Sequence, residues 1–186
     1  AKEFSTFKNI YGYGLMNEPH DLTPETSWFD MAQASINAIR EVDTNTLIMV
    51  GGNDWSSAER WIEQSDTLKY LKDPANNLAF EAHVYFDKDA SGTYKYSYEE
   101  EECYPEKGID RVKPFVEWIK QNKFHGFIGE YGIPDNDPRW NETLDLFLGY
   151  LQENGINGTY WAAGPWWDTY FMAITPKDGK DRPQMP

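Results

Sequence analysis

Two glutamates stand where apolar stretches of the chain end, and their carboxyl groups could do chemistry together. Glu18 lies in "NEP" (17–19), directly after the apolar run 11–16, and Glu130 lies in "GFIGEYG" (126–132). The two are 112 residues apart in the sequence. Two carboxyl groups at one edge of a sheet can divide proton transfer and nucleophilic attack between them, provided that one keeps its proton and the other stays ionised.

Further side chains able to bind a polar ligand follow the other apolar runs. An amide or imidazole can hydrogen-bond a hydroxyl group, a phenol can orient a carboxylate, and an indole can stack on a flat apolar face. Each has a structural alternative, because such residues also serve in turns, loops or the core. The candidates are Asn17, His20, Trp55, His83, Tyr85 and Trp161.

Strand-like and helix-like segments alternate along the whole chain. The expected strands are 9–16, 46–50, 78–86, 126–132 and 157–163. The first expected helix begins at a Thr23-Pro24 cap and ends near Asp43. Three further helices are expected over 57–71, 109–122 and 138–155. Between 87 and 107 lies a polar insert rich in Tyr and Glu, which we expect to be a solvated loop. Strict alternation of this kind predicts an α/β fold with a parallel sheet.

Two α/β architectures compete for this pattern. A doubly wound domain usually carries a glycine-rich phosphate loop, and neither G-x-G-x-x-G nor G-x-x-x-x-G-K-[ST] occurs in the sequence. A (β/α)8 TIM barrel instead carries its chemistry at the ends of several strands, as this sequence does. Five strands do not close such a barrel. We therefore expect a partial (β/α)8 barrel, in which residues 1–186 form one part of a single catalytic domain.

Composition narrows the class of ligand. The formal net charge of −14 disfavours nucleic acid and anionic membranes as partners. Eight Trp and twelve Tyr suit the apolar C–H faces of sugar rings, although aromatic residues also fill cores. No segment reaches the roughly 18–20 apolar residues of a membrane span. No paired-histidine spacing indicates a metal site, and we expect neither a metal nor another cofactor.

Four motifs resemble, in order and spacing, glycoside hydrolase family 5 of the retaining clan A, and in particular its cellulase (endo-β-1,4-glucanase) members. They are "LMNEP" (15–19), "AHVYFD" (82–87), "IGEYG" (128–132) and "TYWAAGPWW" (159–167). The resemblance covers essentially the whole chain and corresponds to about the fourth to eighth βα units of the barrel. Retaining glycosidases hold two carboxyl groups about 5–5.5 Å apart across one glycosidic bond.

The resemblance implies a role for each candidate residue. Glu18 would be the acid/base and Glu130 the nucleophile. Tyr85 would hold Glu130 by a hydrogen bond, and His83 would contact the substrate or the acid/base. The remaining positions would bind sugar: Asn17 at the 2-hydroxyl, Trp161 as a platform beside the scissile bond, Trp55 at an outer subsite, and His20 facing the cleft.

The resemblance also implies that the N-terminal βα units, with an Arg that contacts the nucleophile, are missing before Ala1. We expect them as a lost segment or as a separate chain. The expected partner is then a β-glucan oligo- or polysaccharide, acted on outside the cell. Three alternatives stay open: a β-mannanase or other β-glucanase of the same family, a protein that binds carbohydrate without cleaving it, and an inactive fragment.

Overall fold

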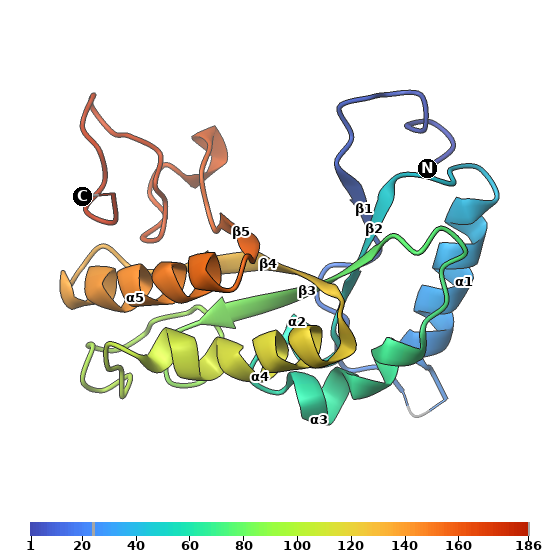
Figure 1. Cartoon of the computed structure of the whole chain (residues 1–186). Helices are drawn as coiled ribbons and strands as arrows, with labels where there is room; N and C mark the ends of the chain where they lie inside the picture. The colour runs from blue at the N-terminus through green and yellow to red at the C-terminus, as the bar shows by residue number, and fades with distance from the viewer. Residues whose placement is uncertain (24, 186) are drawn as a thin grey trace. The chain divides into compact units, whose positions relative to one another are not determined.

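The computed structural model describes residues 1–23 and 25–185, in which five strands alternate with helices (Figure 1). The strands lie in one sheet in the order β1-β2-β3-β4-β5, and the pairs β1–β2 and β2–β3 are parallel. The strands are β1 (Gly12–Gly14), β2 (Leu47–Gly51), β3 (Leu78–Tyr85), β4 (His125–Gly132) and β5 (Asn157–Tyr160). The helices are α1 (Trp28–Arg40), α2 (Asn53–Ser56), α3 (Trp61–Ser65), α4 (Lys107–Asn122) and α5 (Arg139–Glu153), with 3-10 turns η1 (Asp66–Tyr70) and η2 (Pro165–Trp167).

The chain divides into two compact units, which we describe separately. The first unit is Ala1–Ala82 with Pro114–Phe127, and the second is His83–Lys113 with Ile128–Pro186. Strands β3 and β4 each begin in the first unit and end in the second. The candidate residues at the ends of β3, β4 and β5 therefore belong to the second unit, and those that follow β1 and β2 belong to the first.

The core of the first unit is built from aromatic side chains. Trp61 packs edge-on against Phe115 and Trp118, with ring centroids 4.7 Å and 5.5 Å away. Phe80 of β3 meets the ring of Trp118 at 4.9 Å. All four side chains are almost fully buried, so they exclude water from the contact between these helices and the sheet.

Helix α1 buries the apolar stripe that the sequence predicts, but its start lies later than expected. Trp28, Ala32 and Ile36 are buried. The N-cap is Ser27, whose hydroxyl accepts a hydrogen bond from the Asp30 amide, so the prediction of a cap at Thr23 was wrong. Pro24, the other half of that prediction, lies outside the described residues.

The second unit has its own aromatic core. Phe147 of α5 packs edge-on against Phe86 and Tyr131, each with ring centroids at 5.3 Å. Trp140, also on α5, is met edge-on by Tyr94 and Tyr98 from the polar insert, at 5.0 Å and 4.7 Å. The insert is therefore packed on α5 instead of extending into solvent.

The acidic part of the insert differs from the solvated loop expected from its composition. Glu101 is only 3 % exposed, and its carboxylate accepts hydrogen bonds from the backbone N–H groups of Lys88 (2.8 Å) and Tyr96 (2.9 Å). Lys107 Nζ donates to the carbonyl of the same Glu101 at 2.8 Å. A buried carboxylate with two amide donors organises a loop from within, which composition alone does not reveal.

Other boundaries differ by a few residues. The strands predicted over 9–16 and 157–163 are present as β1 and β5, but both are shorter than predicted. The helix expected over 57–71 is split into α3 and η1. Within residues 1–23 and 25–185, no helix combines the length and the apolar character needed to cross a membrane.

Candidate active site

In the first unit, the segment that carries Glu18 is held by close backbone contacts with the end of β2. The Leu15 amide donates to the Met49 carbonyl at 3.1 Å, which extends the β1–β2 pairing by one residue. A Cβ atom on Gly51 would lie 3.2 Å from the Met16 carbonyl oxygen, so glycine permits this close approach. Glu18 itself is partly exposed and has a left-handed φ of 45°, while the following Pro19 is buried.

His20 and Trp55 form a stacked pair beside this segment. Their rings are 4.4 Å apart and nearly parallel, at 11°. The Trp55 amide donates to the Pro19 carbonyl at 3.3 Å, and His20 Nδ1 lies 2.9 Å from Asp21 Oδ2. Trp55 keeps 42 % of its surface exposed, which leaves part of the indole available to a ligand. Asn17 is exposed on the same loop.

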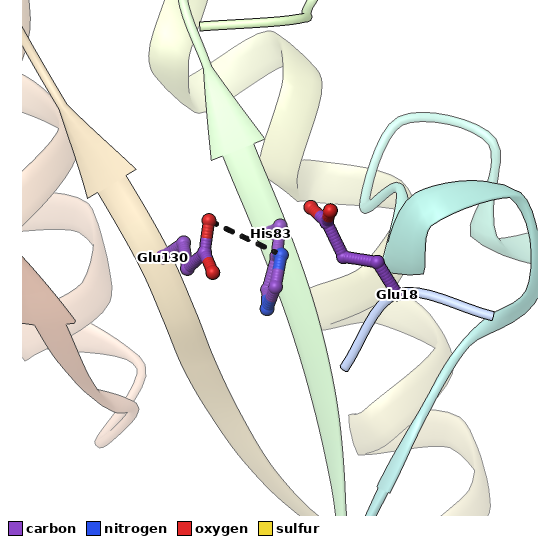
Figure 2. Close-up of side chains that lie close together, drawn as sticks. All are labelled: Glu18, His83 and Glu130. Atoms are coloured by element: carbon purple, nitrogen blue, oxygen red, sulfur yellow. Dashed lines mark ion pairs between the residues drawn. The ribbon is translucent and has the colours of Figure 1, made fainter. Parts of the chain in front are cut away.

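In the second unit, Glu130 of β4 meets Tyr85 and His83 of β3. The Tyr85 hydroxyl donates to Glu130 Oε2 at 2.7 Å, the hydrogen bond that the resemblance predicts. His83 Nδ1 lies 3.6 Å from the same oxygen, as the dashed line in Figure 2 marks. His83 and Tyr85 are 6 % and 7 % exposed, while the Glu130 side chain is 14 % exposed. Figure 2 also draws Glu18, which comes from the loop after β1.

This arrangement favours an ionised Glu130. A phenol that donates to a carboxylate stabilises its negative charge, and a protonated imidazole nearby does the same. Because the surroundings are largely buried, water screens these interactions little. Glu130 is therefore placed to act as an anion that still has an exposed face, which is what a carboxylate nucleophile needs.

The polar insert holds Tyr85 in position, and its main anchor is not among the candidates named from the sequence. The buried Asp87 carboxylate accepts hydrogen bonds from the amides of Gly92 (3.0 Å) and Thr93 (2.9 Å). Gly92, with φ of 71°, lies so close to the Tyr85 ring that a Cβ there would be 2.9 Å from it. Arg111 donates to the Tyr85 carbonyl. Asp87 closes the motif "AHVYFD", but its chain position gives no sign of this anchoring role.

Trp161 lies one residue after β5, and other aromatic rings surround it. Its amide donates to the Tyr131 carbonyl at 2.8 Å, and its ring is 5.0 Å from that of Trp167. The indole N–H of Trp161 donates to the Tyr170 side chain, and burial together with the charge of Glu130 raises the pKa of Tyr170. The indole of Trp161 is only partly buried, so this cluster presents an aromatic face from the unit that holds Glu130.

Glutamate and histidine side chains also bind metal ions in proteins. Glu18, His83 and Glu130 carry carboxylate and imidazole groups of the kind that bind divalent ions. Metal-ligating carboxylates and imidazoles are normally oriented by hydrogen bonds to their remaining polar atoms. Here the phenol of Tyr85 donates directly to Glu130 Oε2, so that oxygen is already engaged by a donor.

The family model "Cellulase (glycosyl hydrolase family 5)" matches residues 1–166. Endo-beta-1,4-glucanase B of Emericella nidulans is 36 % identical over 184 residues, covering 96 % of this chain and 53 % of the relative. The Pseudomonas stutzeri endoglucanase Cel5A, solved in complex with cellobiose, is 45 % identical, with a TM-score of 0.90 over 98 % of this chain and 54 % of that one. XacCel5A, solved in complex with cellopentaose, is 38 % identical with a TM-score of 0.86, over 98 % and 59 %.

The fold is therefore that of consecutive βα units of a (β/α)8 barrel, as the sequence predicts. The chain belongs to the cellulase family, glycosyl hydrolase family 5. It spans about half the length of the relatives that it matches.

Proposed function

We propose that the protein is a retaining endo-β-1,4-glucanase that cleaves its substrate by double displacement, with Glu130 as nucleophile and Glu18 as acid/base. The observation that carries the proposal is the 2.7 Å hydrogen bond from Tyr85 to Glu130 inside a largely buried group. A donated hydrogen bond of this kind stabilises the ionised form of the Glu130 carboxylate, which is the form that attacks. The choice of a β-1,4-glucan rests on the related endoglucanases, two of which were solved with cello-oligosaccharides.

In the first step, a Glu130 oxygen attacks the anomeric carbon while Glu18 donates its proton to the departing glycosidic oxygen. The C–O bond to the leaving sugar breaks, and a covalent glycosyl-enzyme forms. In the second step, Glu18 takes a proton from water, whose oxygen attacks the same carbon and displaces the Glu130 carboxylate. Two inversions give net retention, and both glutamates return to their starting protonation states.

The remaining candidate residues bind and orient the sugar. Asn17 is proposed to hydrogen-bond the 2-hydroxyl, and His83, which is 3.6 Å from Glu130, to fix the carboxylate and contact the substrate. Trp161 is proposed to stack under the sugar beside the scissile bond. The exposed face of Trp55, backed by His20, is proposed to stack on a sugar farther away.

The proposal includes a partner for the chain itself. The relatives are nearly twice as long as the segment matched, and we propose that further βα units complete the barrel, in the same polypeptide or as a separate chain. The complete enzyme would then act on a polysaccharide outside the cell, because polymeric β-glucans are found there.

The test is hydrolysis of a soluble cellulose derivative by the complete enzyme and by its Glu130→Gln variant. The substituted amide keeps the size of the side chain but is a poor nucleophile, so we expect sugar release to fall about 10⁴-fold or more. Proton NMR of the first product should show retention of the anomeric configuration. Equal release by both proteins would refute the catalytic role, and an inverted product would refute double displacement.

The same assay separates the alternatives. Binding of cello-oligosaccharides with no cleavage by the wild-type enzyme would support a carbohydrate-binding protein. Faster release from a soluble mannan than from the cellulose derivative would support a β-mannanase. The two-glutamate mechanism would stand in the second case and fail in the first.

A further inference from the structure

Tyr94 links the ends of the two strands that carry Tyr85 and Glu130. Its hydroxyl oxygen accepts a hydrogen bond from the Phe86 amide at 2.9 Å and donates to the Gly132 carbonyl at 2.6 Å. Phe86 directly follows Tyr85, and Gly132 is two residues beyond Glu130. One phenol therefore bridges two backbones, each next to one partner of the Tyr85–Glu130 hydrogen bond.

The surroundings of Tyr94 leave its hydroxyl little freedom. The residue is 7 % exposed, and its ring packs edge-on against Trp140 at 5.0 Å. The Tyr94 amide is itself held by the Asp87 carboxylate at 3.2 Å. Burial raises the pKa of Tyr94 well above its ordinary value, so the phenol keeps the proton that it donates to Gly132.

Nothing in this arrangement brings Tyr94 to the carboxylate itself. Its hydroxyl has one donor hydrogen, which is given to Gly132, and it is occupied as an acceptor by Phe86. A role in the reaction would therefore act through the backbone positions of its two neighbours.

We infer that Tyr94 is a positioning residue, which sets the distance between the Tyr85 hydroxyl and Glu130 by joining the ends of β3 and β4. The inference rests on the proposed function of Glu130 as nucleophile. Removing the Tyr94 hydroxyl leaves the Phe86 N–H and the Gly132 C=O without this partner and lets the two strand ends move apart. A displacement of a fraction of an ångström is enough to weaken the hydrogen bond on which Glu130 depends.

The structure offers a matched control in Tyr98. It is also 7 % exposed and also packs edge-on against Trp140, at 4.7 Å. Its hydroxyl, however, hydrogen-bonds the Thr143 side chain at 3.1 Å, on α5. Tyr98→Phe therefore removes a buried hydroxyl from a ring that packs on the same tryptophan, and it leaves the hydrogen bonds between the ends of β3 and β4 in place.

The experiment compares Tyr94→Phe and Tyr98→Phe in the complete enzyme, at a temperature well below both melting points. We expect Tyr94→Phe to lower kcat about ten- to a hundredfold, with KM changed less than about twofold. The acidic limb of its rate profile should move to higher pH, because a weaker donor stabilises the Glu130 anion less. Tyr98→Phe should keep the wild-type kcat and profile. Equal losses of kcat in the two variants, or an unmoved acidic limb in Tyr94→Phe, would overturn the inference.

A second measurement does not depend on activity. In protein labelled with ¹³C at the glutamate carboxyl carbons, the Glu130 signal is the one that disappears in Glu130→Gln. We expect its titration midpoint to rise in Tyr94→Phe and to stay unchanged in Tyr98→Phe. An unchanged midpoint in Tyr94→Phe refutes the inference even where the enzyme proves active. A raised midpoint in an enzyme that cleaves no glycan supports the inference while the proposed function fails.

Discussion

The two catalytic candidates sit in very different surroundings. Glu130 lies on a regular strand, accepts a hydrogen bond from a buried tyrosine and has a buried histidine 3.6 Å away. Glu18 lies in a loop after β1, with a left-handed backbone, between the exposed Asn17 and the buried Pro19. The difference matches the proposed roles. A nucleophile keeps one ionisation state until it attacks, whereas an acid/base must release and regain a proton in every cycle.

The support for the two residues also differs in kind. In the first unit, backbone contacts fix the loop, such as the close approach of Met16 to Gly51. In the second unit, buried polar groups hold the backbone around the Tyr85–Glu130 pair. Asp87 accepts from the amide of Gly92, which lies against the Tyr85 ring, Arg111 donates to the Tyr85 carbonyl, and Tyr94 donates to the Gly132 carbonyl. Such a network costs most when one member is removed, because its partners are left buried and unsatisfied.

The largest expected effects test whether the two glutamates have different roles. The experiment neutralises each glutamate in turn and varies the leaving group of the substrate. We expect Glu130→Gln to be inactive on every substrate, because the nucleophile is needed whatever departs. Glu18→Gln should lose about 10²–10⁴-fold on a polysaccharide but little in the first step with an aryl glycoside of an acidic phenol, which leaves without a proton. Stopped-flow detection of a phenol burst, followed by slow turnover, would show this. If Glu18→Gln impaired the reaction equally on both substrates, Glu18 would not be the general acid.

A smaller effect is expected from Tyr85→Phe, which removes the donor and keeps the ring. A hydrogen bond to a charged group contributes about 1.5–3 kcal/mol, so we expect kcat/KM to fall about ten- to a hundredfold. The acidic limb of the rate profile should move to higher pH, because Glu130 loses a donor to its ionised form. Measuring the profile for both proteins tests this. A variant with a lower rate and an unmoved acidic limb would mean that Tyr85 acts on something other than Glu130.

Much of the fold is predictable from the sequence because hydrophobic periodicity reports which elements exist. The α1 stripe of Trp28, Ala32 and Ile36 and the continuous apolar run of β2 mark a helix and a buried strand. Element ends are less predictable. Ser27 caps α1 in preference to Thr23 by accepting a local hydrogen bond from the Asp30 amide, and the sequence offers three residues suitable for a cap within five positions, Thr23, Thr26 and Ser27.

The site divides in the same way. Residues with a chemical signature at a strand end, such as Glu130 and Tyr85, are recognisable from the sequence. The residues that position them are not. Asp87, Tyr94 and Glu101 lie in a polar insert with no periodicity, where acidic and aromatic side chains look solvated until the chain folds back on itself. Tyr94 packs on Trp140 of α5, far away in the sequence, whereas Asp87 and Glu101 accept hydrogen bonds from backbone amides of the insert itself. Composition carries no record of these contacts.

The two proposed aromatic platforms, one in each unit, are expected to give smaller effects when substituted. Trp161 packs against Trp167 and donates its indole N–H to the Tyr170 side chain, whereas Trp55 stacks on His20. We expect Trp161→Ala to lower kcat/KM about tenfold or more, because the platform lies in the unit that holds the nucleophile. Trp55→Ala should raise KM a few-fold with kcat retained, since one aromatic contact contributes about 0.5–1.5 kcal/mol. Kinetics on cello-oligosaccharides of increasing length test this. A larger loss from Trp55→Ala would reverse the assignment.

The smallest effect on activity is expected at Asp43, which lies just before the start of β2. The candidate residue Trp55 follows the opposite end of that strand. Hydrogen bonds from Thr46 and Asn45 lower the pKa of Asp43 below its ordinary value. A carboxyl group whose pKa is depressed by folding stabilises the native state above its unfolded pKa of about 3.9 and loses that contribution as pH falls through the lower folded value. Asp43→Asn should therefore melt a few degrees below wild type at pH 7 and at pH 5, with the gap closing below about pH 4. Its kcat and KM should be unchanged, because the lost bonds stabilise the turn into β2 and touch no proposed catalytic group. An Asp43→Asn enzyme that melts normally but works poorly would show that the two ends of this strand are not independent.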